Sequence, residues 1–444
     1  MIKKPNIIII RIIKIGLFAL FCCTYSLYFS SCRNNPLDPG NISSDPLGLL
    51  DNNFNGSGYA LFSSPVGGSA RGVETESQSD GKIVVMGYAS NGTNTDIMLL
   101  RYNIDGTLDN SFGINGCTLL PGPGNLDDKG LGLAVNKSTD EIVVTGFTYV
   151  SSGNREILTA KFSKNGGLIS TVIFSASYTD IGFAVTFQPD GKILVCGETR
   201  LSGTNQELII LRYNNDLSVD SSFGSGGKVV YNPGTDAKGF GISMQGNDKI
   251  IVCGSVISGG KNNALVLRYS LSGIQDNSFG SGGVFRWNSG FGNDDFSNEL
   301  VLQSDGKILI AGNSMNTLTS GLYVLRLTFN GTLDNTFGIG GVATYTTVSG
   351  YAQVYGIAVS SATGNIIVCG TGKIAEYNDG LVLRLNSNGM VDVSFATAGV
   401  YLFNGPHGNT DAANGLYIQN DRRIVVTGYS SNGTKEDVLT LRLK

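Results

Sequence analysis

The sequence predicts an all-β protein, a seven-bladed β-propeller with four-stranded blades, and three observations support this prediction. The 444 residues include 62 glycines but only 15% charged residues, which is typical of a chain with many short strands and tight turns. A unit of about 57 residues recurs seven times along the chain. The two ends of the chain carry complementary parts of one such unit.

Two anchors and one further motif define the repeat. The first anchor is an isoleucine, preceded by Asp-Gly-Lys in the clearest copies, at Ile83, Ile142, Ile193, Ile250, Ile308, Ile366 and Ile424. The second is a basic residue in an apolar run about 18 residues later, at Arg101, Lys161, Arg212, Arg268, Arg326, Arg384 and Arg442. The motif Leu-Asp-x-x-Phe follows at 108–112 and 333–337, in altered form in other copies, and is missing from the second copy.

Each unit contains four runs with high β-propensity that are separated by Gly, Asn and Asp turns, such as 356–359, 366–369, 381–385 and 399–403. Four antiparallel strands in about 40 to 60 residues are typical of one propeller blade. A linear β-solenoid is the alternative architecture, but solenoid coils are usually much shorter than this unit.

The ends of the chain predict how the ring closes. The last copy stops just after its third strand, at 441–444. An extra Leu-Asp-x-x-Phe at 50–54, followed by an apolar run at 59–62, precedes the first complete copy. We therefore expect the N-terminal run to supply the missing outer strand of the last blade, because a closed ring has no open sheet edges.

The basic anchor residues lie inside apolar strands, where an unpaired charge is costly, so each is expected to pair with a carboxylate of its own or the adjoining blade. The candidate carboxylates are Asp109, Asp220, Asp276, Asp334 and Asp392. The phenylalanines of the third motif are expected in the core between blades. Three cysteines at one repeat position are expected to be buried free thiols without a disulfide framework; they are Cys196, Cys253 and Cys369.

Together, the D-G-K-I, L-x-R-Y and L-D-x-S-F-G motifs resemble the bacterial delta-60 repeat, a β-propeller module, over about residues 50 to 444. Each motif is weak alone, but the set is specific because its members recur in the same order. The resemblance implies a propeller fold and a secreted or surface setting. It implies no defined activity and supplies no catalytic residues.

Residues 1–31 are typical of a lipoprotein signal peptide. Four basic residues precede an apolar stretch at 15–27, and Phe29-Ser30-Ser31-Cys32 resembles a lipobox, with phenylalanine where leucine is usual. Residues 32–48, rich in Pro, Asn and Ser, are expected to form a lipidated tether, and 49–444 the propeller. We expect a bacterial lipoprotein at the outer membrane or cell surface; an uncleaved transmembrane anchor is the alternative.

Charge and histidine content exclude several functions. Cleavage before Cys32 would remove four cations and no acids, which changes the net charge from −4 to −8. An acidic body argues against nucleic acid as a partner. His407, the single histidine, lies in a predicted loop. The sequence therefore lacks the imidazole constellations of Ser/His/Asp triads and most catalytic zinc sites.

Five aspartates lie 13 or 14 residues before the isoleucine anchor, where the chain enters the innermost strand: Asp128, Asp180, Asp236, Asp295 and Asp411. They are expected near one mouth of the central channel, where Ca²⁺ or a cationic partner would relieve their mutual repulsion. Alternatively, each carboxylate caps a turn by accepting backbone N–H bonds. Trp287, in a variable loop on the same face, is expected either to contact a partner or sugar or to pack between blades.

These features predict a non-catalytic binding or scaffold module, held at the envelope through its N-terminal lipid, with a protein or glycan as its ligand. Two alternatives stay open. One is a carbohydrate-active hydrolase or lyase that uses acidic residues at the channel mouth. The other is a purely structural surface protein.

Replacing Cys32 by alanine should abolish lipid labelling, because the predicted lipid is attached to this thiol. Metabolic labelling with palmitate, followed by purification of the chain, measures the effect. Cys22→Ala, in the predicted signal peptide, is the matched control and should keep the label. A labelled Cys32→Ala protein would show that the lipobox assignment is wrong.

Overall fold

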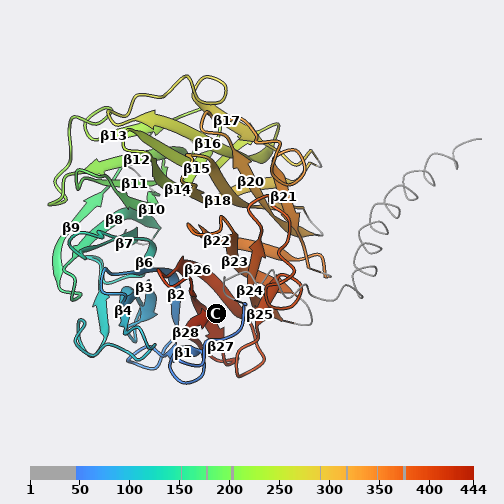
Figure 1. Ribbon diagram of the computed structural model, residues 1–444. Helices are drawn as coiled ribbons and strands as arrows, with labels where there is room; N and C mark the ends of the chain where they lie inside the picture. The colour runs from blue at the N-terminus through green and yellow to red at the C-terminus, as the bar shows by residue number, and fades with distance from the viewer. Residues whose placement is uncertain are drawn as a thin grey trace, which may run out of the picture. The chain divides into compact units, whose positions relative to one another are not determined.

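Seven four-stranded antiparallel sheets are arranged around one axis (Figure 1). The computed structural model describes residues 47–151, 153–176, 179–201, 205–290, 292–316, 319–347, 349–373 and 377–444. The lipidation site expected at Cys32 lies outside the described residues. Within them, no helix has the length and apolar character needed to cross a membrane. The predicted seven-bladed propeller is confirmed.

The first strand of each sheet lies nearest the axis (Figure 1). These inner strands are β2 (Ala70–Ser77), β6 (Asp128–Val135), β10 (Ile181–Phe187), β14 (Ala237–Gln245), β18 (Asp294–Leu302), β22 (Ala352–Val359) and β26 (Asp411–Ile418). The second strands are β3 (Ile83–Ser90), β7 (Ile142–Ser151), β11 (Ile193–Thr199), β15 (Lys249–Ser258), β19 (Ile308–Met315), β23 (Ile366–Lys373) and β27 (Ile424–Ser431). The isoleucine anchor is thus the first residue of six second strands and the second residue of β15.

The third strands carry the basic anchor near their ends. They are β4 (Thr95–Tyr102), β8 (Asn154–Phe162), β12 (Glu207–Tyr213), β16 (Lys261–Ser270), β20 (Ser320–Leu327), β24 (Asn378–Leu385) and β28 (Glu436–Leu443). The outer strands are β5 (Cys117–Leu120), β9 (Leu168–Phe174), β13 (Lys228–Tyr231), β17 (Val284–Trp287), β21 (Val342–Tyr345), β25 (Val400–Phe403) and β1 (Tyr59–Phe62). We number the blades 1 to 7 from β2–β5 to the last sheet, in which β1 joins β26, β27 and β28.

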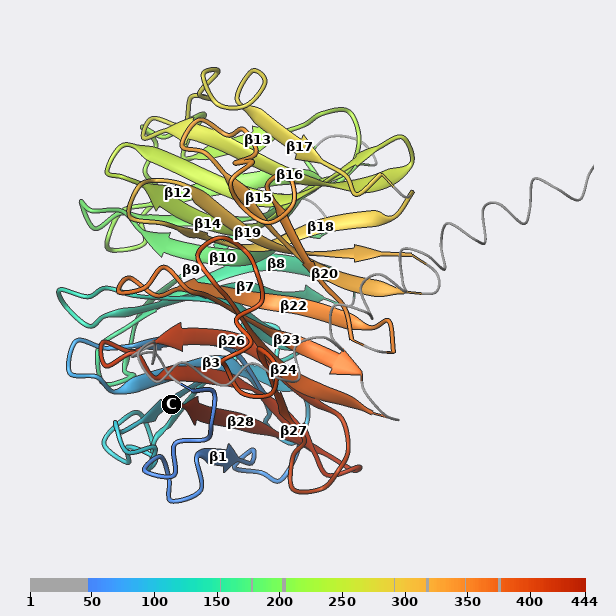
Figure 2. The ribbon, with the colours of Figure 1, turned by 45° about the vertical axis from the view of Figure 1, so that its right-hand side comes forward.

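The last blade combines both ends of the chain, as predicted. Strand β1 pairs with β28, with Tyr59 opposite Leu441, and the two strands lie side by side in Figures 1 and 2. The N–H of Asp51 donates to the carbonyl of Arg442 at 2.8 Å. Its carboxylate accepts from Nε of Arg442 at 2.9 Å. The N-terminal segment therefore supplies both the outer strand and the buried acid of blade 7.

The three sequence motifs meet at one buried ion pair in most blades. In blade 4, Nε of Arg268 lies 3.0 Å from Asp276, and Lys249 reaches the same oxygen at 3.3 Å. The hydroxyl of Ser278 donates to Asp276, and the ring of Phe279 lies 4.8 Å from the guanidinium carbon. The hydrogen bond from Ser278 and the charge of Arg268 lower the pKa of Asp276 to about 2, although burial acts in the opposite direction. The predicted pairing of basic anchors with carboxylates is confirmed.

The same guanidinium also connects neighbouring blades. Nη1 of Arg268 donates to the carbonyl of Phe329 in blade 5 at 2.7 Å. Phe279 inserts against the same turn, where a Cβ added to Gly331 would lie 2.6 Å from the ring. Gly331 has a φ of 79°, which favours glycine, and the absence of a Cβ leaves room for the ring. Equivalent arginine bonds to the next blade are made by Arg101, Arg212, Arg326 and Arg442.

Blade 2, which lacks the Leu-Asp-x-x-Phe motif, is stabilised differently. Lys161 pairs with Glu141 at 3.0 Å and donates to the carbonyl of Asn215 in blade 3 at 2.9 Å. The turn position that holds glycine in most blades is Leu217 in blade 3. Leu217 is buried at a φ of 68° and joins the hydrophobic cluster between these blades. Its side chain occupies the junction where other blades insert a phenylalanine.

The cysteines expected as free thiols are buried and unpaired. Cys196, Cys253 and Cys369 are fully buried in second strands, and Cys117 is buried in β5. Burial raises the pKa of Cys117 to about 12. None of the described cysteines forms a disulfide. These thiols pack as small apolar side chains.

Deleting residues 33–63 should destabilise the ring, because β1 is lost and Arg442 loses its buried carboxylate. Leaving one member of a buried ion pair without its partner costs about 3–5 kcal/mol. Urea unfolding followed by circular dichroism measures the change. Deletion of residues 33–46 is the control and should leave the unfolding midpoint unchanged. Equal midpoints for both deletions would refute closure by β1.

Candidate binding site on the ring axis

The aspartates singled out in the sequence fall into two structural positions. Four of them lie two residues before the bulge of an inner strand and are buried: Asp128, Asp180, Asp295 and Asp411. Each accepts a backbone N–H from the preceding connection, at 2.5, 2.7, 2.8 and 2.6 Å respectively. A Thr or Ser of the second strand stands beside each one, as Thr199 does where it donates to Asp180 at 2.6 Å. Burial raises the pKa of Asp128 and Asp411.

Asp236 is not equivalent to these four, which corrects the expectation of one shared position. It precedes β14, in which Ala237 takes the equivalent place. Its carboxylate accepts the N–H of Gln206 in the preceding blade at 2.8 Å, as Asp294 does from Asn262 at 2.9 Å. Asp128 and Asp236 both lie 14 residues before their isoleucine anchors. They differ in position on the inner strand because the turn from β6 to β7 is one residue longer than the turn from β14 to β15.

These contacts match turn capping rather than an open acidic ring. The four equivalent carboxylates are at most 1% exposed, and their hydrogen bonds order the connections that enter the inner strands. Among the described residues, no three His, Cys, Asp or Glu side chains are grouped so that they could hold a metal ion. A Ca²⁺ or ligand role at these positions remains a prediction, and it would require buried carboxylates to become exposed.

Trp287 ends the outer strand β17, away from the axis. Its ring lies 4.7 Å from that of Tyr323 in blade 5, and the side chain packs against the cluster between blades 4 and 5. The structure therefore shows the packing contact that was one of the two expectations. The residue is partly exposed, and its role in partner contact stays a prediction.

The inner strands come closest to one another just after a β-bulge that all seven share. A Cβ added to Gly132 would lie 2.8 Å from Cα of Ala184, and one added to Gly415 would lie 2.8 Å from Cα of Glu74. The residues at this position around the ring are Glu74, Gly132, Ala184, Gly241, Glu299, Gly356 and Gly415. Five blades thus carry glycine or alanine here, and blades 1 and 5 carry glutamate.

Glu74 and Glu299 influence each other across the axis. Blades 1 and 5 are not neighbours in the ring, so these carboxylates cannot meet within the wall between adjacent blades. Burial, with the charge of Glu299 as a second cause, raises the pKa of Glu74 well above its usual value. Burial raises the pKa of Glu299 to about 7, although its Oε1 accepts the N–H of Leu300 at 2.9 Å. Glu299 is therefore partly protonated near neutral pH.

Sequence reasoning missed this pair because it searched for residues that recur. Both glutamates lie nine residues before the isoleucine anchor, as Ala184, Gly241 and Gly415 do, whereas Gly132 and Gly356 lie ten residues before it. The available signal was a glutamate at a repeat position that otherwise holds a small residue. Glu76, two residues further along β2, adds a third carboxylate, which pairs with Lys137.

Nearer one end of the axis, aromatic and basic side chains alternate across blades 7, 1 and 2. Arg71 lies over the ring of Tyr429, with Cζ 4.3 Å from its centroid. Tyr88 is the cross-strand neighbour of Arg71. Lys129 lies over Tyr88, with Nζ 4.7 Å from its centroid. We call Tyr429, Arg71, Tyr88 and Lys129 the axial ladder; Arg71 is three residues before Glu74 on the same strand.

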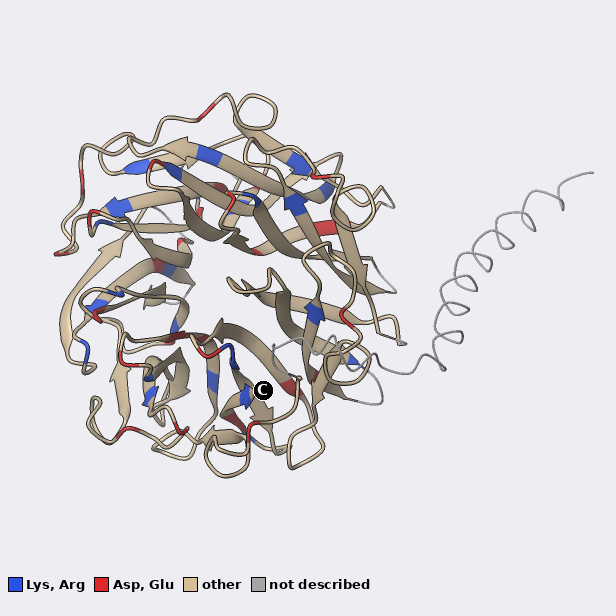
Figure 3. Cartoon of the chain, viewed as in Figure 1, with Lys and Arg blue, Asp and Glu red and all other residues tan. Residues whose placement is uncertain are grey.

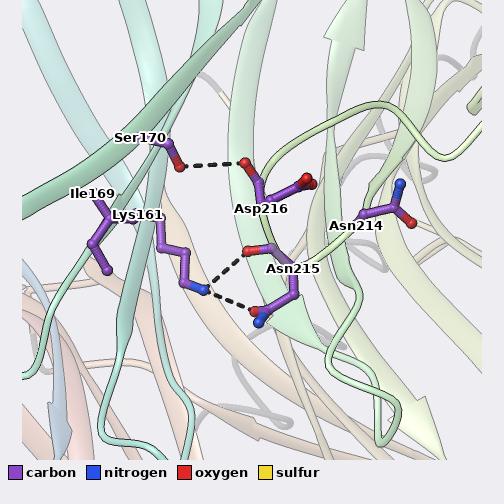
Figure 4. A pocket seen from close by; sticks show the side chains of 6 residues that line it. All are labelled: Lys161, Ile169, Ser170, Asn214, Asn215 and Asp216. Atoms are coloured by element: carbon purple, nitrogen blue, oxygen red, sulfur yellow. Dashed lines mark hydrogen bonds between the residues drawn. The ribbon is translucent and has the colours of Figure 1, made fainter.

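A separate surface pocket lies at the junction of blades 2 and 3, where the phenylalanine motif is missing. Its volume is about 570 Å³, and Lys161, Ile169, Ser170 and residues 214–216 line it (Figure 4). Nζ of Lys161 is bound to Glu141 and to Asn215, and the hydroxyl of Ser170 donates to the carbonyl of Asp216 at 3.4 Å. Lys161 and Ser170 of this pocket are thus already bound to other residues of the protein. In the ring as a whole, residues of both charges are spread around all sides (Figure 3).

Comparison with known families matches the repeat. Five segments match the family described as "Domain of unknown function (DUF5122) beta-propeller": residues 78–112, 188–223, 245–279, 303–337 and 362–395. Each runs from the turn before a second strand to the phenylalanine of the third motif, in blades 1, 3, 4, 5 and 6. The matches support a β-propeller repeat in these five blades. No curated protein matches the sequence significantly.

Solved structures share the architecture at low identity. A structure titled as a new family of polysaccharide lyase, PL25 ulvan lyase, has a TM-score of 0.50 at 11% identity, covering 83% of this chain and 94% of its own. A protein of unknown function from Dyadobacter fermentans DSM 18053 has a TM-score of 0.41 at 11% identity, covering 87% and 97%. Sqt1 from Chaetomium thermophilum, bound to the N-terminus of ribosomal protein L10, has 0.44 at 12%, covering 83% and 84%. At 11% identity, the likeness to the lyase structure shows the fold alone.

Glu299→Gln should flatten the dependence of stability on pH. Because the folded pKa of about 7 exceeds the usual value of 4.5, the folded state binds the extra proton. The wild-type free energy of unfolding should therefore fall as pH rises from about 4.5 to about 7. At pH 8 the variant should be more stable by about 1–3 kcal/mol, and the gain should disappear near pH 4.5.

Urea titrations between pH 4 and pH 8 test this prediction. Glu156→Gln, in the third strand β8 away from the axis, is the matched control and should follow the wild type. Parallel wild-type and Glu299→Gln curves across this range would contradict a buried carboxyl on the axis.

Proposed function

We propose that this protein is a non-catalytic binding module, anchored by a lipid at the bacterial envelope, which holds its ligand on the ring axis at Glu74 and Glu299. The observation that carries the proposal is the pair itself. Two blades place a carboxylate where the remaining five carry glycine or alanine, and both carboxylates are held partly desolvated.

The energetic cost of this arrangement supports a ligand. Burial and the charge of Glu299 raise the pKa of Glu74, and burial raises the pKa of Glu299, so both carboxyls destabilise the protein without ligand at neutral pH. Glycine or alanine would avoid that cost, as it does in five blades. Functional groups are kept at the expense of stability at binding sites. The pair is therefore better explained by a ligand than by the needs of the fold.

The chemistry of the pair indicates the kind of group that it binds. Carboxylates accept hydrogen bonds from hydroxyl and amine groups, and an ammonium group would relieve their repulsion. Cys253 and Cys369 lie behind this level of the ring and are fully buried, so they offer no competing polar contact. A hydroxyl-rich glycan and a basic segment of a protein both fit these requirements.

The proposed location follows from the N-terminal sequence. The lipobox-like Phe29-Ser30-Ser31-Cys32 and the Pro- and Asn-rich residues after it support a lipid anchor with a tether. The resemblance to the delta-60 repeat implies the same secreted or surface setting. A ring on a tether would be free to meet ligands in the periplasm or outside the cell.

A hydrolase or lyase is the second candidate, and one observation favours it. A carboxyl with a pKa of about 7, next to a second carboxyl, can donate or accept a proton near neutral pH. This pair lies deeper along the axis than the aspartates considered in the sequence. The polysaccharide lyase named above shares the fold and adds no residue-level support.

Capture from envelope extracts by the full chain, immobilised in detergent, tests the proposed function. Glu74→Gln/Glu299→Gln should lose a ligand that the wild type retains, because the amides no longer carry charge. Glu156→Gln/Asp248→Asn removes two charges away from the axis and should behave as the wild type. Circular dichroism confirms that each variant is folded.

The outcomes separate the three functions. A ligand that the wild type and the control retain and the axial variant loses supports a binding module. Release of new reducing ends or unsaturated sugars from an added polysaccharide, lost in the axial variant, would favour the enzyme. Nothing retained by any of the three proteins would favour a structural role and overturn the proposal.

A further inference from the structure

The axial ladder contains basic groups with unused hydrogen-bonding capacity. Nζ of Lys129 lies over Tyr88 and has no ion pair or hydrogen bond with any residue that the structure describes. Arg71 forms a bidentate pair with Glu436 through Nε and Nη2, which leaves Nη1 without a partner in the same part of the chain. Both residues are partly exposed. Two donors, one with an uncompensated charge, are therefore available on neighbouring inner strands.

This arrangement is specific to three blades. At the position of Arg71 and Lys129, the other blades carry Ile181, Lys238, Phe296, Gln353 and Ala412. Lys238 is neutralised by Glu198 at 2.7 Å. An unpaired lysine stacked on tyrosine therefore occurs at one place around the axis. Like the glutamate pair, it departs from the repeat, which argues against a role that every blade requires.

Charge and geometry point to an anionic group as the occupant. Stacking on the tyrosine faces holds the basic groups in place, so less side-chain entropy is lost when an anion binds. A guanidinium or ammonium bond to a carboxylate or sulfate is charge-assisted and stronger than a neutral hydrogen bond. Tyr355 of blade 6 is partly exposed close to the ladder; burial raises the pKa of its hydroxyl, and the charges of Tyr429 and Arg71 are smaller causes. Its ring can pack against the apolar face of a sugar.

We propose that the axial ladder binds the acid groups of an anionic saccharide, such as a uronate or a sulfated sugar. This inference rests on the proposed function, because it names the ligand class of the same axial site. The acid group lies at Lys129 and Nη1 of Arg71. The sugar hydroxyls donate to Glu74 and Glu299, which lie further along the axis.

The charge distribution favours a saccharide over a nucleic acid. The full chain has a net charge of −4, and the ladder offers only two basic groups. Nucleic-acid sites usually neutralise several phosphates, with about six to ten contacts for a specific duplex site. A saccharide with one acid group on every one or two sugars needs no more than the ladder provides.

Binding of polygalacturonate to the full chain, measured by isothermal titration calorimetry in detergent and low salt, tests the inference. Lys129→Gln should weaken binding about tenfold, the usual value of a charge-assisted hydrogen bond. Arg71→Gln/Glu436→Gln, which removes the ion pair without leaving an unpaired charge, should weaken it similarly. Lys261→Gln, at an exposed ion pair on blade 4, is the matched control and should bind as the wild type.

Further probes distinguish the classes of ligand. Heparin in place of polygalacturonate tests a sulfated sugar, dextran tests a neutral one, and single-stranded DNA tests a nucleic acid. Binding of either acidic polymer that falls in the ladder variants supports the inference. Equal binding by wild type and ladder variants, or preference for dextran or DNA, would overturn it. A ligand of another class that is lost in Glu74→Gln/Glu299→Gln would leave the proposed function intact while overturning this inference.

Discussion

The buried pair of an arginine on the third strand and an aspartate of the following motif is the interaction on which the rest of the ring depends. Its guanidinium binds the aspartate of its own blade and a carbonyl of the next blade, and it covers a phenylalanine that fills the junction. Removing one partner of such a pair costs about 3–5 kcal/mol, because the other charge stays buried. The pair therefore explains why the arginine and the aspartate recur at a fixed distance from each other, and it joins each blade to the next.

Blade 2 shows what this constraint requires. It has no aspartate–phenylalanine motif, yet its basic anchor still finds a carboxylate in Glu141 and a carbonyl in Asn215. The volume of the missing ring is taken by Leu217 from blade 3, at a φ that usually belongs to glycine. The chain thus preserves the paired charge and the filled junction while exchanging the residues that provide them.

Recurrence and departure carry different information in this protein. The residues that recur, including Asp128 and its three equivalents, have buried contacts that order strands and turns. The residues that break the repeat, Glu74, Glu299 and Lys129, lie toward the axis and have polar groups that the fold does not need. Stability explains the recurring residues, and binding explains the residues that break the repeat. The proposed site is therefore built from residues that break the repeat.

The sequence by itself determined the number of blades, their four strands, the aspartate partners of five of the seven basic anchors and the closure by residues 59–62. These features depend on contacts within one unit or between adjacent units, so every copy repeats the evidence. Only the tertiary structure decided which residues meet on the axis. Glu74 and Glu299 are joined there by ring geometry, although they are 225 positions apart in the chain. A turn one residue longer in blade 2 gives Asp128 the same distance from its anchor as Asp236, although the two differ in position, because register depends on strand pairing and not on distance from an anchor.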